Sequence, residues 1–375
     1  MRITIVQGPF FPVPPLLGGA VEKVWYALGK EFARLGHNVT HISRNFNGFP
    51  TTEIIDSVNH IRVNSFNATS FLYYNLLLDV IYALRVYRNL PEADILISNC
   101  FSLPLFIRNK KFGLLYIHLA RKPKGQLFLY RHAARIQTVS KSVEHDIINQ
   151  EPYLEDRIKT IHYPFPMNLN YKNPVDIVNS KEKKMLYVGR LHPEKGLDIL
   201  IGAFNELIRH TNDWTLEIVG PWEISQGGAG YKYYSDLKKI SQPSGQKIRF
   251  AGFVYDEAVL SNYYKTAKLF IYPSIAEQGE SFGLAPLEAM SFGCVPIVSS
   301  LDCFKDFIDD GESGYVFDHR ADNSKNILSD ILIRLIRSDL GEISVNTIRK
   351  SKQFSLEQIS QIYLDDFSEL IRNNN

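Results

Sequence analysis

Residues 269–299, LFIYPSIAEQGESFGLAPLEAMSFGCVPIVS, are the part of this chain around which the predicted fold is organised. The apolar runs at 269–273 and 295–299 predict two buried strands. Between them, the sequence predicts a glycine-containing loop and then a helix from about residue 282. Strand, loop, helix and strand in this order are typical of a parallel sheet covered by helices. Glu280 falls in the loop and Glu288 inside the helix, eight positions apart.

The start of the predicted helix is a candidate phosphate site. Ser281, Phe282, Gly283 and Leu284 would offer backbone N–H groups at a helix N-terminus, where the helix dipole also favours an anion. Gly283 would allow a ligand to come close to the backbone. Together with the flanking carboxylates, these groups would suit a sugar attached to a diphosphate.

The same alternation of strands and helices extends over the chain. Residues 3–6 and 39–42 predict strands that flank a helix opened by Gly18 and Gly19, which together form a βαβ unit. A second alternating series begins at residue 185. Tyr163-Pro164-Phe165-Pro166 interrupts every regular pattern between the two series, because two close prolines favour an extended linker.

We therefore predict an α/β protein with two Rossmann-like domains, each built on a parallel sheet. The predicted boundaries are 1–166 for the N-terminal domain and 167–352 for the C-terminal domain. An amphipathic helix in 353–375 is predicted to cross back to the N-terminal domain. The glycine-rich run Gly227-Gly228-Ala229-Gly230 does not directly follow a predicted strand, and we predict that it forms a flexible loop.

Size and composition predict an ordered cytoplasmic protein. The chain has 375 residues, 45% hydrophobic and 22% charged, with a formal net charge of +2. It opens on a strand-like run without the basic and apolar segments of a signal peptide. Residues 71–86 are apolar but too short to span a bilayer, which predicts a core helix. Cys100, Cys294 and Cys303 lack metal or redox spacing, which predicts buried free thiols.

Charge is unevenly distributed in the N-terminal half. Residues 95–143 contain no Asp or Glu, although they hold many Lys and Arg residues, including Lys110, Lys111, Lys122 and Lys124. A solvated basic face and a surface for an anionic acceptor or for membrane headgroups are both consistent with this distribution. Peripheral contact with the inner membrane face is therefore one of the partner hypotheses.

Several motifs occur in order, each at a predicted strand-to-helix corner. They are Gly18-Gly19, Gly189-Arg190 with Glu194-Lys195-Gly196, Ile218-Val219-Gly220, Phe250-Ala251-Gly252-Phe253, and Glu280 with Glu288. With this ordered set the chain resembles the retaining glycosyltransferases of family 4. The resemblance covers most of the length and is strongest over 184–316. It implies the GT-B fold, in which two Rossmann-like domains face each other across a cleft.

The resemblance implies roles for individual residues on the donor side. Arg190 and Lys195 would neutralise the diphosphate as the glycosidic bond breaks. Glu280 would contact the transferred sugar, and Glu288 would accept hydrogen bonds from the ribose diol. Further donor contacts are implied for Gly18, Gly19, Gly189, Gly220, Phe253, Val254, Ser281, Phe282, Gly283 and Leu284.

His118 ends a predicted strand, at a position where the family often carries a histidine near the reacting carbon or the acceptor. We list it as a catalytic candidate, although a lone histidine is often structural. No DxD motif stands at a strand end, since Asp309-Asp310 and Asp365-Asp366 fall in turn-like or amphipathic segments. The prediction is therefore no cofactor and no essential metal.

The implied reaction is transfer of a hexose, with retained configuration, from a nucleoside diphosphate sugar to a sugar or lipid-linked acceptor in polysaccharide or glycoconjugate synthesis. UDP-glucose is the donor favoured by its frequency in the family. A GDP-mannose-dependent mannosyltransferase, a nucleotide-sugar epimerase of similar fold and a non-catalytic nucleotide-sugar sensor stay open. An NAD-dependent oxidoreductase is disfavoured because no strand is followed by G-x-G-x-x-G. The sequence predicts no nucleic-acid partner.

Overall fold

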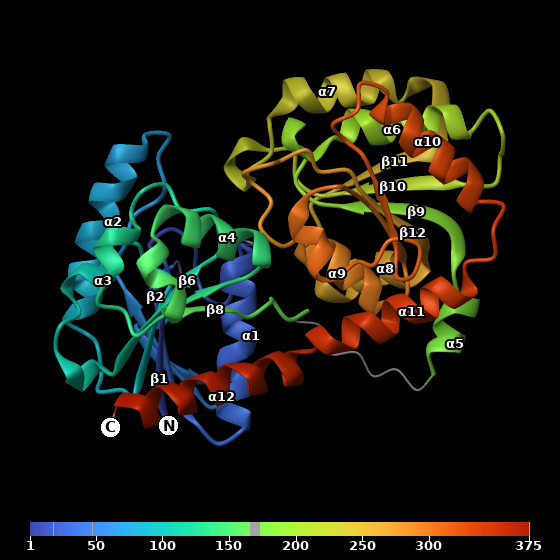
Figure 1. Ribbon diagram of the computed structural model, residues 1–375. Helices are drawn as coiled ribbons and strands as arrows, with labels where there is room; N and C mark the ends of the chain where they lie inside the picture. The colour runs from blue at the N-terminus through green and yellow to red at the C-terminus, as the bar shows by residue number, and fades with distance from the viewer. Residues whose placement is uncertain (18, 47, 166–172, 375) are drawn as a thin grey trace. The chain divides into compact units, whose positions relative to one another are not determined.

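The protein is described by a computed structural model of residues 1–17, 19–46, 48–165 and 173–374, shown in Figure 1. The chain divides into two compact units. One unit combines Met1–Pro166 with Phe354–Asn375, and the other is Met167–Gln353. Each unit is built on its own sheet and is described separately below.

The sheet of the N-terminal unit has eight strands in the order β3-β4-β2-β1-β5-β6-β7-β8. Every pairing is parallel except the antiparallel pairing of β3 with β4 at one edge. The central strands are buried on both faces, as a parallel sheet covered by helices requires. The strands are β1 (Arg2–Val6), β2 (Asn38–Arg44), β3 (Thr52–Ile55), β4 (Val58–Val63), β5 (Ile95–Ser98), β6 (Leu114–Leu119), β7 (Arg135–Thr138) and β8 (Ile158–Thr160).

The C-terminal helix α12 packs on the first helix, α1, within this unit. Tyr363 lies against Trp25 with ring centroids 5.2 Å apart, and Phe367 lies 5.9 Å from Phe32. The apolar face of the amphipathic helix predicted in 353–375 is therefore buried against α1. The helices of the unit are α1 (Ala20–Arg34), α2 (Leu72–Tyr87), α3 (Leu103–Phe106), α4 (Lys141–Gln150) and α12 (Leu356–Asn374), with short 3₁₀ turns at Lys110–Phe112, Leu127–Tyr130 and Pro152–Arg157.

The prediction that residues 71–86 form a core helix is only half right. Leu78, Tyr82, Ala83 and Val86 of α2 are buried, whereas the first turns of the helix are exposed. We use the name α2 surface for these exposed apolar residues, which are Phe71 (72% exposed), Leu72 (67%), Tyr73 (86%), Tyr74 (51%) and Leu77 (53%). A continuous apolar run cannot show which side of a helix faces the core, because periodicity is lost in it.

The C-terminal unit has six strands, all parallel, in the order β11-β10-β9-β12-β13-β14. Their carboxyl ends meet at one edge, where ligands bind in open parallel sheets. The strands are β9 (Glu182–Val188), β10 (Thr215–Val219), β11 (Ile248–Gly252), β12 (Ala267–Tyr272), β13 (Val295–Ser299) and β14 (Tyr315–Phe317).

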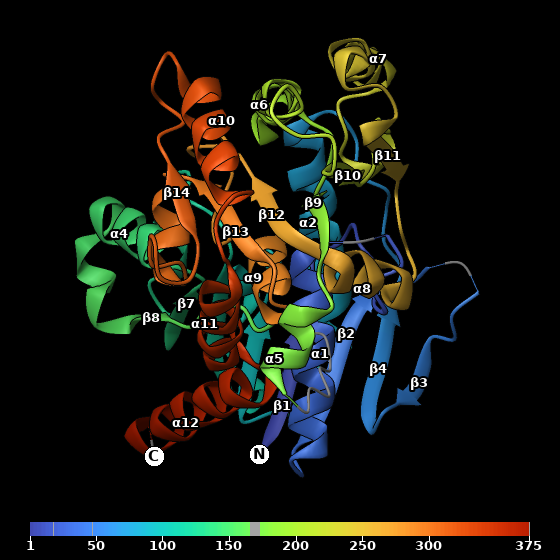
Figure 2. The same cartoon turned by 90° about the vertical axis from the view of Figure 1, so that its right-hand side faces the viewer.

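Helices cover both faces of this second sheet. Figure 1 shows α6, α7 and α10 along one face, and α8, α9 and α11 along the other; Figure 2 shows the unit from the side. The helices are α5 (Pro174–Asn179), α6 (Leu197–Leu207), α7 (Tyr231–Ile240), α8 (Glu257–Thr266), α9 (Leu284–Ser291), α10 (Ser324–Leu335) and α11 (Gly341–Ser351), with 3₁₀ turns at Pro193–Lys195, Ile224–Gln226, Gln242–Lys247, Asp302–Asp306 and Lys352–Phe354.

One further expectation is confirmed by the fold. The three cysteines, Cys100, Cys294 and Cys303, are free and buried, as predicted. Among the helices of the described residues, none combines the length and apolarity needed to cross a membrane.

Candidate functional site

The loops that follow β9 and β10 are packed against each other at the carboxyl edge of the second sheet. Gly220 has a φ of 146°, and its N–H donates to the Gly252 carbonyl at 2.8 Å. A Cβ on Gly220 would lie 1.9 Å from the carbonyl oxygen of Gly189, so only glycine fits there. Gly189 and Gly220 therefore have a packing role at this edge, and their contact with a donor stays a prediction.

Arg190 leaves the end of β9 and already has two partners in the protein. Its guanidinium donates to Glu194 Oε1 at 2.8 Å and to the carbonyl of Gly227 at 2.8 Å. The side chain is still 42% exposed at the sheet edge. Arg190 is thus oriented by its neighbours while keeping part of its donor surface open to solvent.

Lys195 and Glu280 form a buried ion pair, although they lie 85 positions apart in the sequence. Lys195 Nζ lies 2.6 Å from Glu280 Oε2, and the two side chains are only 7% and 10% exposed. Tyr272 lies beside the pair, with its ring centroid 5.5 Å from Lys195 Nζ. Burial raises the pKa of Tyr272, and the negative Glu280 raises it further. The hydroxyl of Tyr272 therefore stays protonated.

Two backbone contacts hold the loops that carry this pair together. Gly196, with a φ of 63°, lies so close to Pro273 that a Cβ would meet the Pro273 carbonyl oxygen at 2.2 Å. Next to it, the N–H of Ile275 donates to the Glu194 carbonyl at 2.9 Å. The end of β9 and the end of β12 thus converge, and the positions of Lys195 and Glu280 follow from this convergence.

Glu288 lies inside α9 and is buried, with 4% of its surface exposed. The hydroxyl of Tyr264 donates to Glu288 Oε2 at 3.0 Å. Burial raises the pKa of Tyr264, and Glu288 adds to the rise. The carboxylate faces the protein interior rather than open solvent, and its predicted bond to a ribose diol stays a prediction.

Helix α9 begins at Leu284, two residues later than predicted, because Gly283 precedes it with a φ of 88°. A Cβ on Gly283 would lie 2.5 Å from the Phe304 ring. Phe282 is buried, with its ring centroid 5.0 Å from that of Phe307, whereas Ser281 is half-buried. The structure therefore places these residues at the N-terminus of α9, at the same sheet edge as Lys195.

Phe253 and Val254 follow β11 at this edge and are both half-buried. The Phe253 ring packs edge-on against Tyr255, with centroids 4.1 Å apart. The Tyr255 hydroxyl in turn accepts a hydrogen bond from Gln226 Nε2 at 2.8 Å. This loop is thereby tied to the segment before the glycine run.

The glycine run 227–230 is more constrained than a flexible loop. Its backbone N–H groups donate to Glu223, Leu191 and Trp222 at 2.7–2.9 Å, and Gly227 also accepts from Arg190. A Cβ on Gly228 would lie 2.2 Å from the Trp222 backbone. The run is therefore a packed support for the Arg190 loop, which corrects the sequence-based expectation.

The sequence reasoning missed one polar cluster at the same edge. His319 Nε2 lies 2.9 Å from Glu277 Oε1, and Arg320 Nη2 donates to Glu277 Oε2 at 2.9 Å. Burial opposes ionisation of Glu277, but the bonds from Arg320 and His319 lower its pKa overall. The cluster holds the loop that carries Glu280. The strand before His319, β14, has only three residues, which are too few to show the alternating pattern that predicts a strand.

In the N-terminal unit, the predicted glycine pair is only partly described. Gly18 lies outside the described residues, and Gly19 precedes α1 with a φ of 96°. A Cβ on Gly19 would lie 2.2 Å from Glu22 Oε2, so the Glu22 carboxylate folds back over this glycine. Burial raises the pKa of Glu22 to about 7. This buried carboxylate in the first turn of α1 was not anticipated.

His118 is the last but one residue of β6, and both of its ring nitrogens lie near protein partners. Nδ1 lies 2.5 Å from Gln137 Oε1, and Nε2 lies 2.9 Å from the Tyr163 hydroxyl. Burial lowers its pKa to about 4, so the imidazole is neutral. A histidine held in this way is oriented by its surroundings, and its predicted catalytic role is not established by these contacts.

The comparison with family models identifies the C-terminal unit. Residues 172–353 match the model described as "Glycosyl transferases group 1". This range covers every donor-side residue predicted after Gly19. The match coincides with the unit in which Arg190, Lys195, Glu280 and Glu288 gather.

Known proteins are similar to the chain over most of its length or over less than half of it. It is 26% identical over 333 residues to an uncharacterized glycosyltransferase of Methanocaldococcus jannaschii, which covers 80% of this chain and 81% of that one. It is 31% identical over 159 residues to a phosphatidyl-myo-inositol mannosyltransferase of Mycobacterium leprae, which covers 42% of this chain and 38% of that protein.

Among solved structures, the Anabaena protein HepE in complex with UDP and glucose has a similar fold. The TM-score is 0.75 at 18% identity, over 98% of this chain and all of that one. The two parallel sheets with helices on their faces are the Rossmann-like domains of such proteins. The chain therefore has the GT-B fold, and its residues 172–353 match the model of the glycosyl transferases group 1 domain.

Proposed function

We propose that this protein is a retaining glycosyltransferase that transfers a hexose from a nucleoside diphosphate sugar to a sugar or lipid-linked acceptor. The observation that carries the proposal is the buried pair of Lys195 and Glu280 at the carboxyl edge of the second sheet. Removing two charges from water costs free energy that their attraction offsets only in part, so a buried ion pair contributes little net stability. Burial of such a pair at a sheet edge therefore favours a functional reason for it. Arg190 lies on the same loop as Lys195.

The donor diphosphate would approach a site in which each cation already has an acidic partner. Arg190 is bound to Glu194, and Lys195 to Glu280. These carboxylates orient the cations before the donor arrives. As the bond to the sugar breaks, negative charge grows on the departing phosphate, and cations held in place stabilise that charge without reorganising.

The proposed reaction proceeds with front-face displacement, as the family resemblance implies. The departing phosphate would help to deprotonate the acceptor hydroxyl while Arg190 and Lys195 hold the phosphate. Glu280 is already paired with Lys195, so we assign it to orienting the sugar rather than to forming a covalent intermediate.

For the donor we propose UDP-glucose, with GDP-mannose as the alternative. The complex of the similar HepE with UDP and glucose supports the first, and the mannosyltransferase of Mycobacterium leprae supports the second. A panel of UDP-, GDP- and ADP-sugars tested for thermal stabilisation distinguishes them, since a ligand that binds only the folded state raises the melting temperature. If none of the panel raised it, a nucleotide-sugar function would be rejected.

Two conservative substitutions separate the roles of the carboxylates. Glu280→Gln should lower turnover and relax selectivity for the sugar. The change removes the carboxylate that would accept hydrogen bonds from the sugar and that is also the ion-pair partner of Lys195. Glu288→Gln should mainly weaken nucleotide affinity, by about tenfold if one charged hydrogen bond to the ribose is lost. Steady-state kinetics and UDP titration measure both effects. Equal effects on turnover and affinity in the two variants would contradict the assignment.

We propose that transfer needs no metal ion, since Arg190 and Lys195 carry the charge stabilisation. Turnover should therefore be unchanged in excess EDTA, compared with the same enzyme in added Mg²⁺. An untreated sample in chelator-free buffer is the control. Abolition of turnover by EDTA, with recovery on adding Mg²⁺, would show that the two cations are not sufficient.

For the acceptor we propose a lipid-linked sugar, reached through the α2 surface. Five large apolar side chains exposed at the start of one helix are unusual for a surface that meets only water. The start of α2 follows β4, at the carboxyl edge of the first sheet. Lys122 and Lys124 follow β6 at that same edge, whereas Lys110 and Lys111 precede β6 at the opposite edge.

Because the two lysine pairs lie at opposite edges of the sheet, they allow a matched test of membrane contact. Neutralising Lys122 and Lys124 should weaken binding to anionic phosphatidylserine vesicles, by about 1 kcal/mol per lysine near the surface. Neutralising Lys110 and Lys111 is the matched control and should have the smaller effect. Vesicle co-sedimentation at two salt concentrations measures both. Unchanged binding in every variant would argue for an acceptor in solution.

A further inference from the structure

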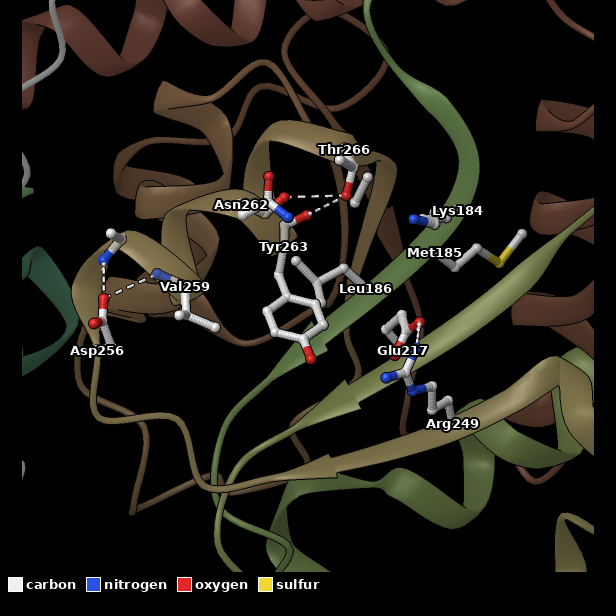
Figure 3. Close-up of a pocket in the computed structure, with 12 residues that line it drawn as sticks. Lys184, Met185, Leu186, Glu217, Arg249, Asp256, Val259, Asn262, Tyr263 and Thr266 are labelled. Atoms are coloured by element: carbon white, nitrogen blue, oxygen red, sulfur yellow. Dashed lines mark hydrogen bonds and ion pairs between the residues drawn. The ribbon is translucent and has the colours of Figure 1, made fainter.

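A pocket on the C-terminal unit contains none of the predicted donor residues. It has a volume of about 530 Å³, which is in the range of small-molecule sites. Helix α8 forms one wall, and the face of strands β9, β10 and β11 forms the other (Figure 3). Its lining includes Lys184, Leu186, Glu217, Arg249, Asn262 and Tyr263.

The strand wall of the pocket is a row of neighbouring side chains. Register pairs Phe270 with Leu186, Leu186 with Glu217, and Glu217 with Arg249, so all four side chains lie on the same face. Helix α8 covers the apolar end of the row, where Tyr264 packs 5.9 Å from Phe270. The polar end, Glu217 and Arg249, is left to line the pocket.

Glu217 is buried at this polar end without full hydrogen bonding. It is 9% exposed, and its Oε2 is a buried atom with no hydrogen-bond partner among the described residues. Its Oε1 lies 3.7 Å from Arg249 Nη1, which is too long for a hydrogen bond. A buried carboxylate oxygen left in this state is costly, and a ligand that donates an O–H or N–H group would satisfy it.

The charges around Glu217 restrict the chemistry of that ligand. Lys184 and Arg249 flank the carboxylate and disfavour a cation, whereas Glu217 itself disfavours an anion. The remaining polar lining includes the carboxylate of Asp256, which already accepts from the N–H groups of Ala258 and Val259, and the exposed amide of Asn262. Tyr263 adds an aromatic ring that extends from α8 (Figure 3). A neutral molecule with several hydroxyl groups and an apolar face fits all of these groups.

We propose that this pocket binds a neutral sugar unit of a glycan, at a site separate from the donor loops. The sugar's hydroxyl groups would donate to Glu217 and accept from Arg249 and Asn262, while its apolar face would pack on Tyr263. The proposal goes beyond sugar transfer, because the pocket would hold a glycan that is not reacting. It does not depend on the identity of the donor.

Isothermal titration with maltose, lactose and N,N′-diacetylchitobiose tests the proposal on the full chain. At least one disaccharide should bind the wild type. Glu217→Gln, which keeps the shape of the side chain, and Tyr263→Ala should each weaken that binding about tenfold. If Tyr263→Ala does not fold, Asn262→Ala takes its place as the second test variant, because Asn262 is exposed and its replacement should not affect folding. Asp213→Asn, an exposed carboxylate of the same unit, is the matched control.

The donor loops supply a second control, because a disaccharide could also bind there. Glu280→Gln should leave disaccharide affinity unchanged if the pocket is the site. The proposal is overturned if no disaccharide binds, if Glu217→Gln and Asn262→Ala bind like the wild type, or if Glu280→Gln causes the loss instead. Competition by inorganic phosphate would also overturn it, since that result would indicate an anion site. UDP affinity, measured in the same variants, reports separately on the donor site.

Discussion

Replacing Lys195 by methionine is expected to lower the turnover of a nucleotide-sugar donor by a factor of about 10²–10³, the usual loss when one preorganised charge-stabilising donor is removed. The same change leaves Glu280 buried without its partner, 10% exposed. Such a broken pair destabilises a protein by about 3–5 kcal/mol. Steady-state kinetics and urea denaturation measure the two effects on one preparation.

A second variant separates catalysis from stability. In the double variant Lys195→Met with Glu280→Gln no charge is left unpaired, so most of the stability should return while turnover stays low. Lys183→Met, which removes an exposed lysine of β9, the strand before the Lys195 loop, is the control and should change neither quantity. If turnover returned together with stability in the double variant, Lys195 would have only a structural role.

Replacing Asp366 by alanine is expected to cause the largest loss of stability in the N-terminal unit. Asp366 lies on α12 with its side chain 1% exposed, and it bridges two strands of the sheet. Arg135 donates to its Oδ1 at 2.7 Å, and the Tyr116 hydroxyl donates to its Oδ2 at 2.9 Å. Removing the carboxylate leaves the buried Arg135 guanidinium with the half-exposed Glu369, 3.9 Å away, as its remaining acidic neighbour, so the loss should approach the value of about 3–5 kcal/mol for a broken buried pair.

Urea denaturation measures this loss, and hydrogen exchange locates it. Amides of α12 and of the β6 and β7 strands should lose protection first, because Asp366 joins them. Asp365→Ala, at the exposed neighbouring position, is the matched control and should stay within about 0.5 kcal/mol of the wild type. Similar stability for the two variants would show that packing of Tyr363 and Phe367 alone fixes the helix.

The long alternating elements could be predicted from the sequence because each carries its own signal. Helix α8 has a start signal in the sequence, since Asp256 caps it by accepting from the N–H groups of Ala258 and Val259. Strand β13 has the predicted bounds, 295–299, because it is a short apolar run between turn residues.

The elements that were missed are short or lie at sheet edges. Strand β3 has four residues with an alternating exposed pattern, and β14 has three. Both are set by their neighbours in the sheet rather than by local propensity. Helix α11 was missed because its polar composition gives no continuous apolar face.

The candidate site could be predicted as a set of residues but not as a set of contacts. The ordered motifs placed Arg190, Lys195 and Glu280 near one sheet edge. No local pattern shows that Lys195 pairs with Glu280, since the pairing depends on how the loops after β9 and β12 converge. The exposure of Phe71 and Tyr73 was missed for a related reason, because exposure is a property of packing.

The release of UDP from UDP-glucose by the purified protein tests the central claim most directly. Many transferases slowly pass the sugar to water, so the proposed activity predicts that UDP accumulates without an added acceptor, and faster with one. Lys195→Met should release far less than the wild type, whereas Lys183→Met should match it. Binding of UDP-glucose without any release of UDP, with or without candidate acceptors, would contradict the account and indicate a nucleotide-sugar sensor.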